Sequence, residues 1–253
     1  DDQELRDYLE QEQSNDLSFL SKEDILKLPQ PSPDTVLFAD SSVVQTILLT
    51  QKSKDVVIDS YPDAFQHLYK RQVAKTTLAA ATTAMEFPYF VKLQGSNKDF
   101  SARIVHSKED HDALVEEIDV HTPVYICDVV DFVAEFRLFL TTKDLVAICE
   151  YSEYMIGHRL QNHHYNDQSP LVVENVQEVP RDFLHQVLRA HGTLNTCCVV
   201  DVGLSSNGEW SVVECNPPFS LSSYGLDMKT YVEYCTHAWK QLWKEKERSE
   251  EEK

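Results

Sequence analysis

The chain has 253 residues, of which 42% are hydrophobic, and its 42 acidic and 23 basic residues give a formal net charge of −19. This length and hydrophobicity are enough to bury a core, as one large domain or as tightly joined subdomains. The acidic excess repels nucleic-acid phosphates and anionic membranes, so neither is expected as a partner, although a local basic pocket remains compatible with it.

Six cysteines are spaced without a C-x-x-C pair, and most lie in hydrophobic segments. This usage is typical of free core thiols in a reducing compartment. The sequence contains no hydrophobic segment of membrane-spanning length, and its acidic first residues are unlike a signal peptide. A cytoplasmic protein is therefore expected.

The first part of the chain predicts a mixture of helix and strand. Residues 1–16 are polar and helix-prone, and SKEDILKL predicts a short helix with Ser21 as its N-cap. After a proline-rich linker, TVLFAD predicts a strand and SVVQTILL a strand or a helix.

The clearest predicted helix is YPDAFQHLYKRQVAKTTLAAATTAM, which begins after Pro62 and is alanine-rich toward its end. In such a helix, Lys70, Arg71 and Lys75 would lie within about a turn and a half. A basic helix face is usually solvated, but it can also bind the phosphates of a nucleotide, and both interpretations stay open.

Strand signals dominate the middle of the chain. FPYFVKLQ predicts a strand, GSNKDFSAR a loop, and SKEDHDALVEEI a surface helix capped by Ser107. Three segments with a period of two follow, and Lys143-Asp144 makes the last two a predicted hairpin: TPVYICDVVD, AEFRLFLTT and LVAICEYSEY.

The carboxyl-terminal part begins with a polar segment, residues 155–172, that is expected to be a loop. Its histidines lack a second cluster with metal spacing, which favours pocket lining over a zinc site: His158, His163 and His164. The remaining predicted elements are a helix in VPRDFLHQVLRAHG, a hairpin in CCVVDVGLSSNGEWSVVECN and a terminal helix in DMKTYVEYCTHAWKQLWKEKERSEEEK.

This hairpin places two carboxylates opposite each other. Counting outward from a two-residue Asn207-Gly208 turn pairs Asp201 with Glu214, and Asn216 lies on the same face one pleat further. Like charges directly opposite in a sheet, with Cβ atoms roughly 4.5–5.5 Å apart, are destabilising. A bound Mg²⁺ ion, which takes oxygen ligands, would explain the pair, and the alternative is a polar face that meets water.

In order and spacing, Asp201, Glu214 and Asn216 resemble the Asp and Glu-x-Asn that ligate Mg²⁺ in the ATP-grasp superfamily. PYFVKLQGSNKDFSA resembles the lysine strand and phosphate loop of that superfamily, and AEFRLFLTTKDLVAI resembles its E-x-R hairpin. Each motif alone is weak, but their common order is fairly specific.

The resemblance spans about residues 36–245 and is closest to the phage-associated R-two-K clade, in which a basic helix precedes the lysine strand. EFRLFL and the overall layout also resemble the ATP-grasp proteins of the cell division cycle protein 123 family. The resemblance implies an α+β ATP-grasp fold that binds ATP and Mg²⁺. Residues 1–85 would form an amino-terminal α/β region, residues 86–124 a small lid subdomain, and residues 125–253 the core subdomain.

The resemblance also implies catalytic roles for Lys92 and Arg137. Lys92 would contact the nucleotide, and Arg137 the transferred phosphoryl group or the substrate carboxylate, because a guanidinium binds either in a bidentate manner. The alternatives are that Lys92 protects a sheet edge and that Arg137 pairs with Glu135 or Asp201. Further candidates for nucleotide binding are Ser96 and Lys98 in the phosphate loop, Asp128 or Asp131 at the ribose, and Lys70 in the basic helix.

The implied function is that of an ATP-dependent carboxylate–amine ligase, which forms an acyl phosphate on a small-molecule or peptide carboxylate. One departure from the family is the phosphate loop, which has a single glycine, Gly95, where many ATP-grasp enzymes have several. The alternative is an ATP-binding assembly chaperone of the cell division cycle protein 123 type, whose acidic surface docks on a basic protein partner. A degenerate interaction module is disfavoured, because an inactive site has no need of opposed carboxylates.

Overall fold

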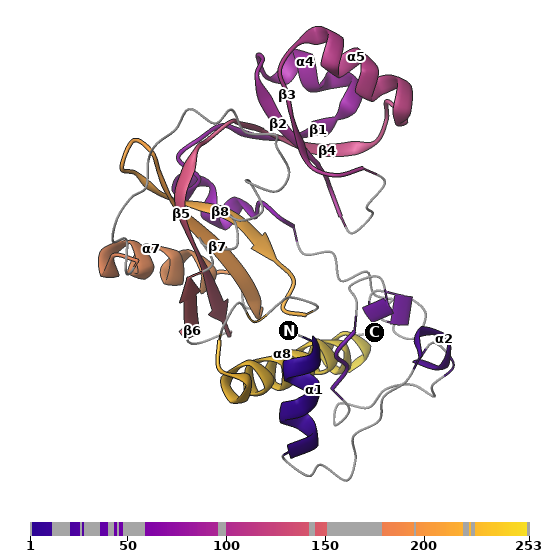
Figure 1. The fold of residues 1–253 in the computed structure, drawn as a ribbon, viewed down its shortest axis with the longest axis vertical. Coiled ribbons are helices and arrows are strands. Elements are labelled where there is room, and N and C mark those ends of the chain that lie inside the picture. Colours follow the sequence, from indigo (N-terminus) through magenta and orange to yellow (C-terminus); the bar gives the residue numbers. More distant parts are fainter. Residues whose placement is uncertain are drawn as a thin grey trace.

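The computed structural model describes residues 2–11, 21–25, 27, 36–39, 43–44, 46–47, 59–95, 100–141, 145–150, 179–194, 196–219, 223 and 226–251. In this part of the chain, two four-stranded antiparallel sheets adjoin each other, and helices cover their faces (Figure 1). The α+β class expected from the sequence is confirmed.

The first sheet has the strand order β1-β4-β2-β3 and lies at the top of Figure 1. Its strands are β1 (Val73–Thr77), β2 (Tyr89–Leu93), β3 (Arg103–Val105) and β4 (Pro123–Asp128). The helical elements of this lobe are the 3-10 helix η2 (Leu78–Ala80), α4 (Ala81–Ala84) and α5 (Lys108–Glu117). Hydrophobic side chains of these elements bury a core of their own between the sheet and the helices.

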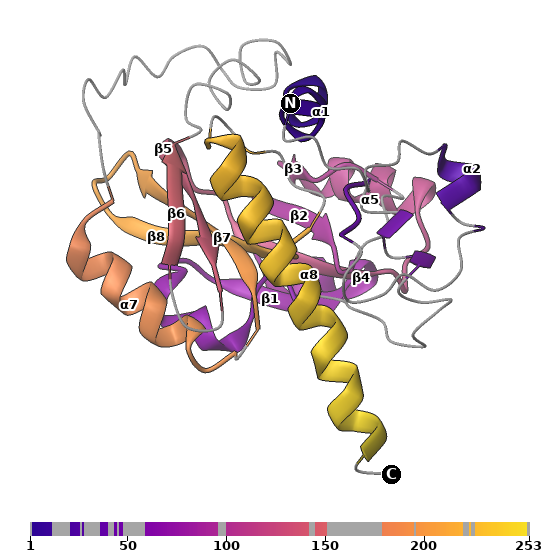
Figure 2. The same cartoon turned by 90° about the horizontal axis from the view of Figure 1, so that it is seen from below.

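The second sheet has the strand order β6-β5-β7-β8. Its strands are β5 (Phe132–Leu140), β6 (Leu145–Glu150), β7 (Cys198–Ser205) and β8 (Trp210–Asn216). One face packs against the 3-10 helix η1 (Asp63–Leu68) and α7 (Arg181–His191). The other face packs against α8 (Met228–Glu251), which crosses in front of the sheet in Figure 2.

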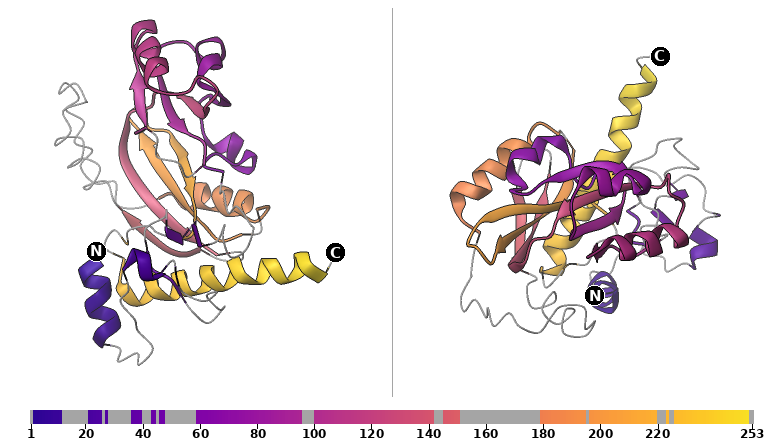
Figure 3. Two further views of the ribbon diagram at one scale, coloured as in Figure 1. Left: turned by 90° about the vertical axis from the view of Figure 1, so that its right-hand side faces the viewer. Right: turned by 90° about the horizontal axis from the view of Figure 1, so that it is seen from above.

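The two sheets share part of one core. Tyr125 and Cys127 of β4 are buried in the cluster that covers the η1 side of the second sheet. Figure 3 shows the two sheets as adjoining lobes, with α8 extending past the second one. At the amino-terminal end, α1 (Asp2–Gln11) packs against α8, and α2 (Lys22–Ile25) is a single short helix.

The strands of the first sheet come from both sides of the expected boundaries after residues 85 and 124. The strand β1 precedes residue 86 and β4 begins close to residue 124, yet both belong to the same sheet as β2 and β3. The division into subdomains at these residues stays a prediction, and the sheets do not follow it.

The long helix predicted after Pro62 is wrong, because a strand interrupts it. The backbone forms η1, turns at Lys70 with φ 52°, and continues as β1, which pairs with β4 from Val73 opposite Cys127 to Thr77 opposite Pro123. Valine and threonine favour a strand when a partner is available, and here the partner lies far along the chain. Lys70, Arg71 and Lys75 therefore share no helix face.

The predicted pairing of Asp201 with Glu214 is confirmed, although the two-residue turn from which it was counted is wrong. Asp201 lies opposite Glu214. The loop has three residues and not two, since Ser205 N–H bonds to the Glu209 carbonyl at 3.0 Å and Gly208 has φ 87°. The register then shifts between Asp201 and Val202, because β8 contains one extra residue there. The longer loop and this β-bulge compensate for each other.

The predicted helix ends agree with the structure. The Ser21 hydroxyl accepts a hydrogen bond from the Asp24 N–H at 3.1 Å, and the Ser107 hydroxyl accepts one from the Asp110 N–H at 3.3 Å. The helix α7 ends at Gly192 as expected.

The strand predicted in TVLFAD is wrong for residues 36–39, whose backbone is irregular and whose side chains pack near Trp239. Residues 43–44 and 46–47 are helical.

The five cysteines whose side chains the structure describes are free thiols, as expected. Cys235 is half-buried, and the other four are buried: Cys127, Cys197, Cys198 and Cys215. None of the described helices combines the length and the hydrophobicity that a membrane crossing requires. The loop predicted at residues 155–172 and the turn at Lys143-Asp144 lie outside the described residues.

Candidate functional site

The second sheet gathers polar side chains on the face that also carries α8. Along β5, β7 and β8, alternation places them on this face: Glu135, Arg137, Asp201, Glu214 and Asn216. Phe139 and Val199 on the same face pack under α8. This face is therefore divided into a hydrophobic part beneath the helix and a polar part beyond it.

Asp201 is held by a bidentate ion pair within the sheet. Arg137 donates from Nε to Asp201 Oδ1 and from Nη2 to Oδ2, both at 2.8 Å. Asn216 Nδ2 donates to Asp201 Oδ2 at 2.9 Å. The side chains of Arg137 and Asp201 are only 7% and 2% exposed, so this is a buried pair in the geometry that suits a guanidinium and a carboxylate. The ion pair with Asp201, one of the alternatives considered for Arg137, is present in the structure.

Glu214 is held by an ion pair between the sheets. Lys92 on β2 of the first sheet places Nζ 2.5 Å from Glu214 Oε2 on β8 of the second. Lys92 Nζ also lies 5.7 Å from the centroid of the Tyr61 ring. Burial raises the pKa of Glu214, but the Lys92 ammonium, the Asn216 amide and the Arg137 charge together lower it below its ordinary value.

Each of the two opposed carboxylates thus has its own cation. Their repulsion does not by itself require a metal ion, since Arg137 and Lys92 already offset both charges. The donor set still fits Mg²⁺, because carboxylate and amide oxygens are its usual ligands. Glu214, with its side chain 25% exposed, and Asn216 are the better-placed donors.

Asp201 fits a metal ion less well. An ionised carboxylate has about four lone-pair sites, and Arg137 and Asn216 use three of those on Asp201. A direct role for Asp201 as a metal ligand stays a prediction. Among the described residues, no group of three His, Cys, Asp or Glu side chains is arranged to hold a metal ion.

The structure describes three further residues that were predicted to bind the nucleotide: Asp128, Asp131 and Lys70. The Asp128 carboxylate accepts a hydrogen bond from the Gln72 N–H at 2.8 Å, where β1 begins and β4 ends. The Asp131 carbonyl accepts one from the Ser206 N–H at 2.9 Å, beside the β7–β8 turn. Lys70 is exposed on the turn before β1. Ser96 and Lys98 lie outside the described residues.

A second lysine, Lys75, was predicted to lie on a helix but lies on the same face of the first sheet as Lys92. Lys75 and Lys92 both lie opposite Tyr125 of β4, so these three residues form a row across the sheet. Lys75 Nζ lies 2.5 Å from Asp59 Oδ2, and the Tyr125 hydroxyl donates to Asp59 Oδ1 at 2.6 Å. Burial raises the pKa of Asp59, whereas the Lys75 and Tyr125 hydrogen bonds lower it, with a net decrease. The alternation Val73-x-Lys75 was the signal for this placement.

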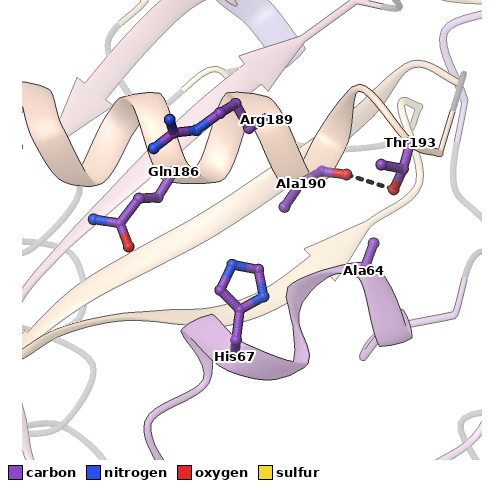
Figure 4. Close-up of a pocket in the computed structure, with 6 residues that line it drawn as sticks. All are labelled: Ala64, His67, Gln186, Arg189, Ala190 and Thr193. Atoms are coloured by element: carbon purple, nitrogen blue, oxygen red, sulfur yellow. Dashed lines mark hydrogen bonds between the residues drawn. The ribbon is translucent and has the colours of Figure 1, made fainter.

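A shallow depression of about 540 Å³ lies elsewhere, between η1 and α7. Figure 4 shows its lining side chains, which are Ala64, His67, Gln186, Arg189, Ala190 and Thr193. None of the residues predicted for nucleotide or metal binding lines it. The two ion pairs, and not this depression, define the candidate site.

Comparison with known proteins identifies the family. No curated protein sequence matches the chain. The profile of the ATP-grasp domain, R-two-K clade family 2, matches residues 68–234, which is more than half of the chain. The chain belongs to the ATP-grasp family, in its R-two-K clade. The matched residues include both sheets and all members of the two ion pairs.

Several solved structures are similar to this chain. D-alanine–D-alanine ligase from Bacillus anthracis superposes with a TM-score of 0.55 at 15% identity, covering 92% of this chain and 87% of that one. The macrocyclase MdnC from Microcystis aeruginosa, solved with the precursor peptide MdnA, superposes with a TM-score of 0.48 at 12% identity, covering 71% and 59%. N5-carboxyaminoimidazole ribonucleotide synthetase from Thermotoga maritima superposes with a TM-score of 0.46 at 12% identity, covering 90% and 63%.

Proposed function

We propose that this ATP-grasp protein is an ATP-dependent ligase that joins a carboxylate to an amine through an acyl phosphate. The observation that carries the proposal is the Lys92–Glu214 ion pair, which spans the two sheets beside the buried Arg137–Asp201 pair. The site thereby brings together one lysine, one arginine and two carboxylates whose side chains are buried or partly buried. Both reactants of acyl-phosphate formation are anionic, so such a reaction depends on charge neutralisation and positioning.

Bound Mg·ATP would supply the phosphoryl group that activates the carboxylate, and Mg²⁺ would offset the negative charge of the phosphates. Glu214 and Asn216 are the proposed metal ligands. Lys92 is proposed to leave Glu214 and to bind nucleotide phosphate, because its ammonium sits on a flexible stem and is 20% exposed. Ser96 and Lys98, with Asp128 or Asp131, remain proposals from the family resemblance.

Arg137 is proposed to act through Asp201. The bidentate contact fixes the Asp201 carboxylate, which in turn accepts a hydrogen bond from Asn216 Nδ2 and so orients the Asn216 side chain. The direct contact between Arg137 and a transferred phosphoryl group, expected from the resemblance, receives no support from this geometry. Arg137 is in this view a positioning residue for the metal-binding end of the site.

The proposed substrates are a small-molecule or peptide carboxylate and an amine. The net charge of −19 favours a second candidate, an ATP-binding assembly factor that docks on a basic protein and does not ligate. The two candidates share the nucleotide site and differ in what releases ADP.

Measurement of ADP release tests the proposed ligation. Purified protein is incubated with Mg·ATP and with pools of amino acids and peptides, and Lys92→Ala serves as the control for contaminating ATPase activity. We expect a pool to stimulate ADP release from the wild-type protein and not from the variant. ATP binding without stimulation by any pool, together with ATP-dependent capture of a basic protein, would contradict ligation and support the assembly factor.

A further inference from the structure

The β-bulge in β8 decides on which face of the second sheet Glu214 lies. Near the turn, Val202 pairs with Val212, and beyond the bulge Asp201 pairs with Glu214. Val213 is the extra residue, immediately before Glu214. If the register at the turn continued without the bulge, Asp201 would face Val213 and Glu214 would lie on the opposite side, because a shift by one residue exchanges the two faces. The carboxylate pair therefore depends on this bulge.

The side chain of Arg71 binds the backbone carbonyls at the bulge. Its Nη1 donates to the Val212 carbonyl at 2.8 Å, and its Nη2 donates to the Val213 carbonyl at 2.6 Å. In a regular strand, successive carbonyls point to opposite sides, so one planar guanidinium reaches two of them only where the strand is distorted. The two donors Nη1 and Nη2 of Arg71 thus fit the carbonyls of the distorted strand and would not fit those of a regular one.

The guanidinium of Arg71 is itself fixed by aromatic rings. Its Cζ lies 5.7, 5.9 and 5.8 Å from the ring centroids of Tyr61, Tyr69 and Phe132. The same segment of the chain contacts β8 a second time, since the Ser60 carbonyl accepts the Cys215 N–H at 2.9 Å. Contacts from this segment therefore lie on both sides of Glu214 along β8.

We propose that Arg71 is a positioning residue that keeps Glu214 and Asn216 in register with Asp201 for metal binding. This inference rests on the proposed function. Arg71 reaches β8 from the chain just before β1 of the first sheet, so it also ties the strand that carries the metal-side residues to the start of the other sheet. A residue that only covered the exposed edge of β8 would affect stability without affecting the metal site.

The test uses Arg71→Lys, which keeps the positive charge and loses the planar pair of guanidinium donors. Arg103→Lys is the matched control. Arg103 is an exposed arginine of β3, and its Nη1 lies 3.7 Å from Glu117 Oε2, away from the bulge. One readout is the Mg²⁺ concentration that gives half of the ATP-dependent rise in melting temperature. The other is amide hydrogen exchange of the β8 peptide in protein without ligand, which needs no activity.

We expect Arg71→Lys to raise the Mg²⁺ midpoint by about 10- to 100-fold, as for other residues that orient metal ligands, and to speed exchange in β8. The affinity for ATP at saturating Mg²⁺ should stay close to that of the wild type, and Arg103→Lys should change neither readout. A lower melting temperature with an unchanged Mg²⁺ midpoint would overturn the inference and leave the proposed function intact. Lower ATP affinity at saturating Mg²⁺ with an unchanged midpoint would also overturn it, by indicating a direct nucleotide contact. Absence of any Mg²⁺-dependent response in the wild type would instead overturn the proposed function.

Discussion

The two ion pairs of the site neutralise opposed carboxylates in different ways. Arg137 and Asp201 lie on neighbouring strands of one sheet, are almost fully buried and make two parallel hydrogen bonds. Lys92 and Glu214 come from different sheets, are 20% and 25% exposed, and share one contact at 2.5 Å. The first pair is part of the framework of the second sheet, and the second pair is a contact between two lobes.

The difference suggests which carboxylate can change its partner. Separating Arg137 from Asp201 would leave two buried charges without compensation, which is costly. Lys92 has a compact ammonium on a flexible stem near solvent, so Glu214 can exchange it for a metal ion at much lower cost. We therefore propose that Glu214 binds the metal ion and that Asp201 holds the site together.

Removal of Arg137 should have the largest effect on stability. Arg137→Ala leaves the Asp201 carboxylate buried without its cation, and the free energy of unfolding should fall by about 3–5 kcal/mol. Urea unfolding of the wild type and the variant measures this change. In the Arg137→Ala background, Asp201→Asn should recover part of the loss, because it removes the uncompensated charge. A loss below about 1 kcal/mol would contradict a structural role for the buried pair.

Removal of the Glu214 charge should have a smaller effect. Glu214→Gln weakens a partly exposed ion pair, and its amide oxygen can still accept from Lys92, so we expect a loss of about 1 kcal/mol in the protein without ligand. Repulsion between the carboxylates, as inferred from the sequence alone, would instead raise the stability. Glu117→Gln is the control, because Glu117 is 62% exposed and 3.7 Å from its partner Arg103. A stability gain in Glu214→Gln would show that Lys92 does not offset the charge.

The smallest expected effect is the pH dependence of the stability that Glu214→Gln loses. The pKa of Glu214 is lowered in the folded protein, so the stability that its charge contributes is fully present above its unfolded pKa, near 4.5, and is lost as the pH falls through the folded value. The difference between wild type and Glu214→Gln in the free energy of unfolding should therefore shrink as the pH is lowered from about 6 to about 3. A difference that grows toward acid pH would contradict the ion pair.

The fold was predictable where the sequence signals are local. Serine caps, the glycine at the end of α7 and the period-two strands all form as expected. The segment after Pro62 shows the limit of such signals, because β1 is a strand through its pairing with β4, about 50 residues further along the chain. Local propensity cannot show a partner at that distance.

The site was predictable in part, because two departures from the predicted hairpin cancel each other. The pairing of Asp201 with Glu214 came from a two-residue turn, whereas the structure combines a three-residue loop with a bulge of one residue. Sequence spacing records only the net register, so it could reveal the pair and not the bulge. The contacts of Arg71 with the Val212 and Val213 carbonyls join distant segments by backbone atoms, which leave no trace in spacing or composition.

The proposed exchange of Lys92 for a metal ion at Glu214 is tested most directly by thermal unfolding with ATP, in the presence and absence of Mg²⁺. In the wild type, ATP should raise the melting temperature only with Mg²⁺, corresponding to about 2.7 kcal/mol when the ligand concentration is 100 times its Kd. In Glu214→Gln, the Mg²⁺-dependent part of the rise should disappear while the protein stays folded. No shift in the wild type at millimolar nucleotide, or an equal shift in Glu214→Gln, would contradict the account.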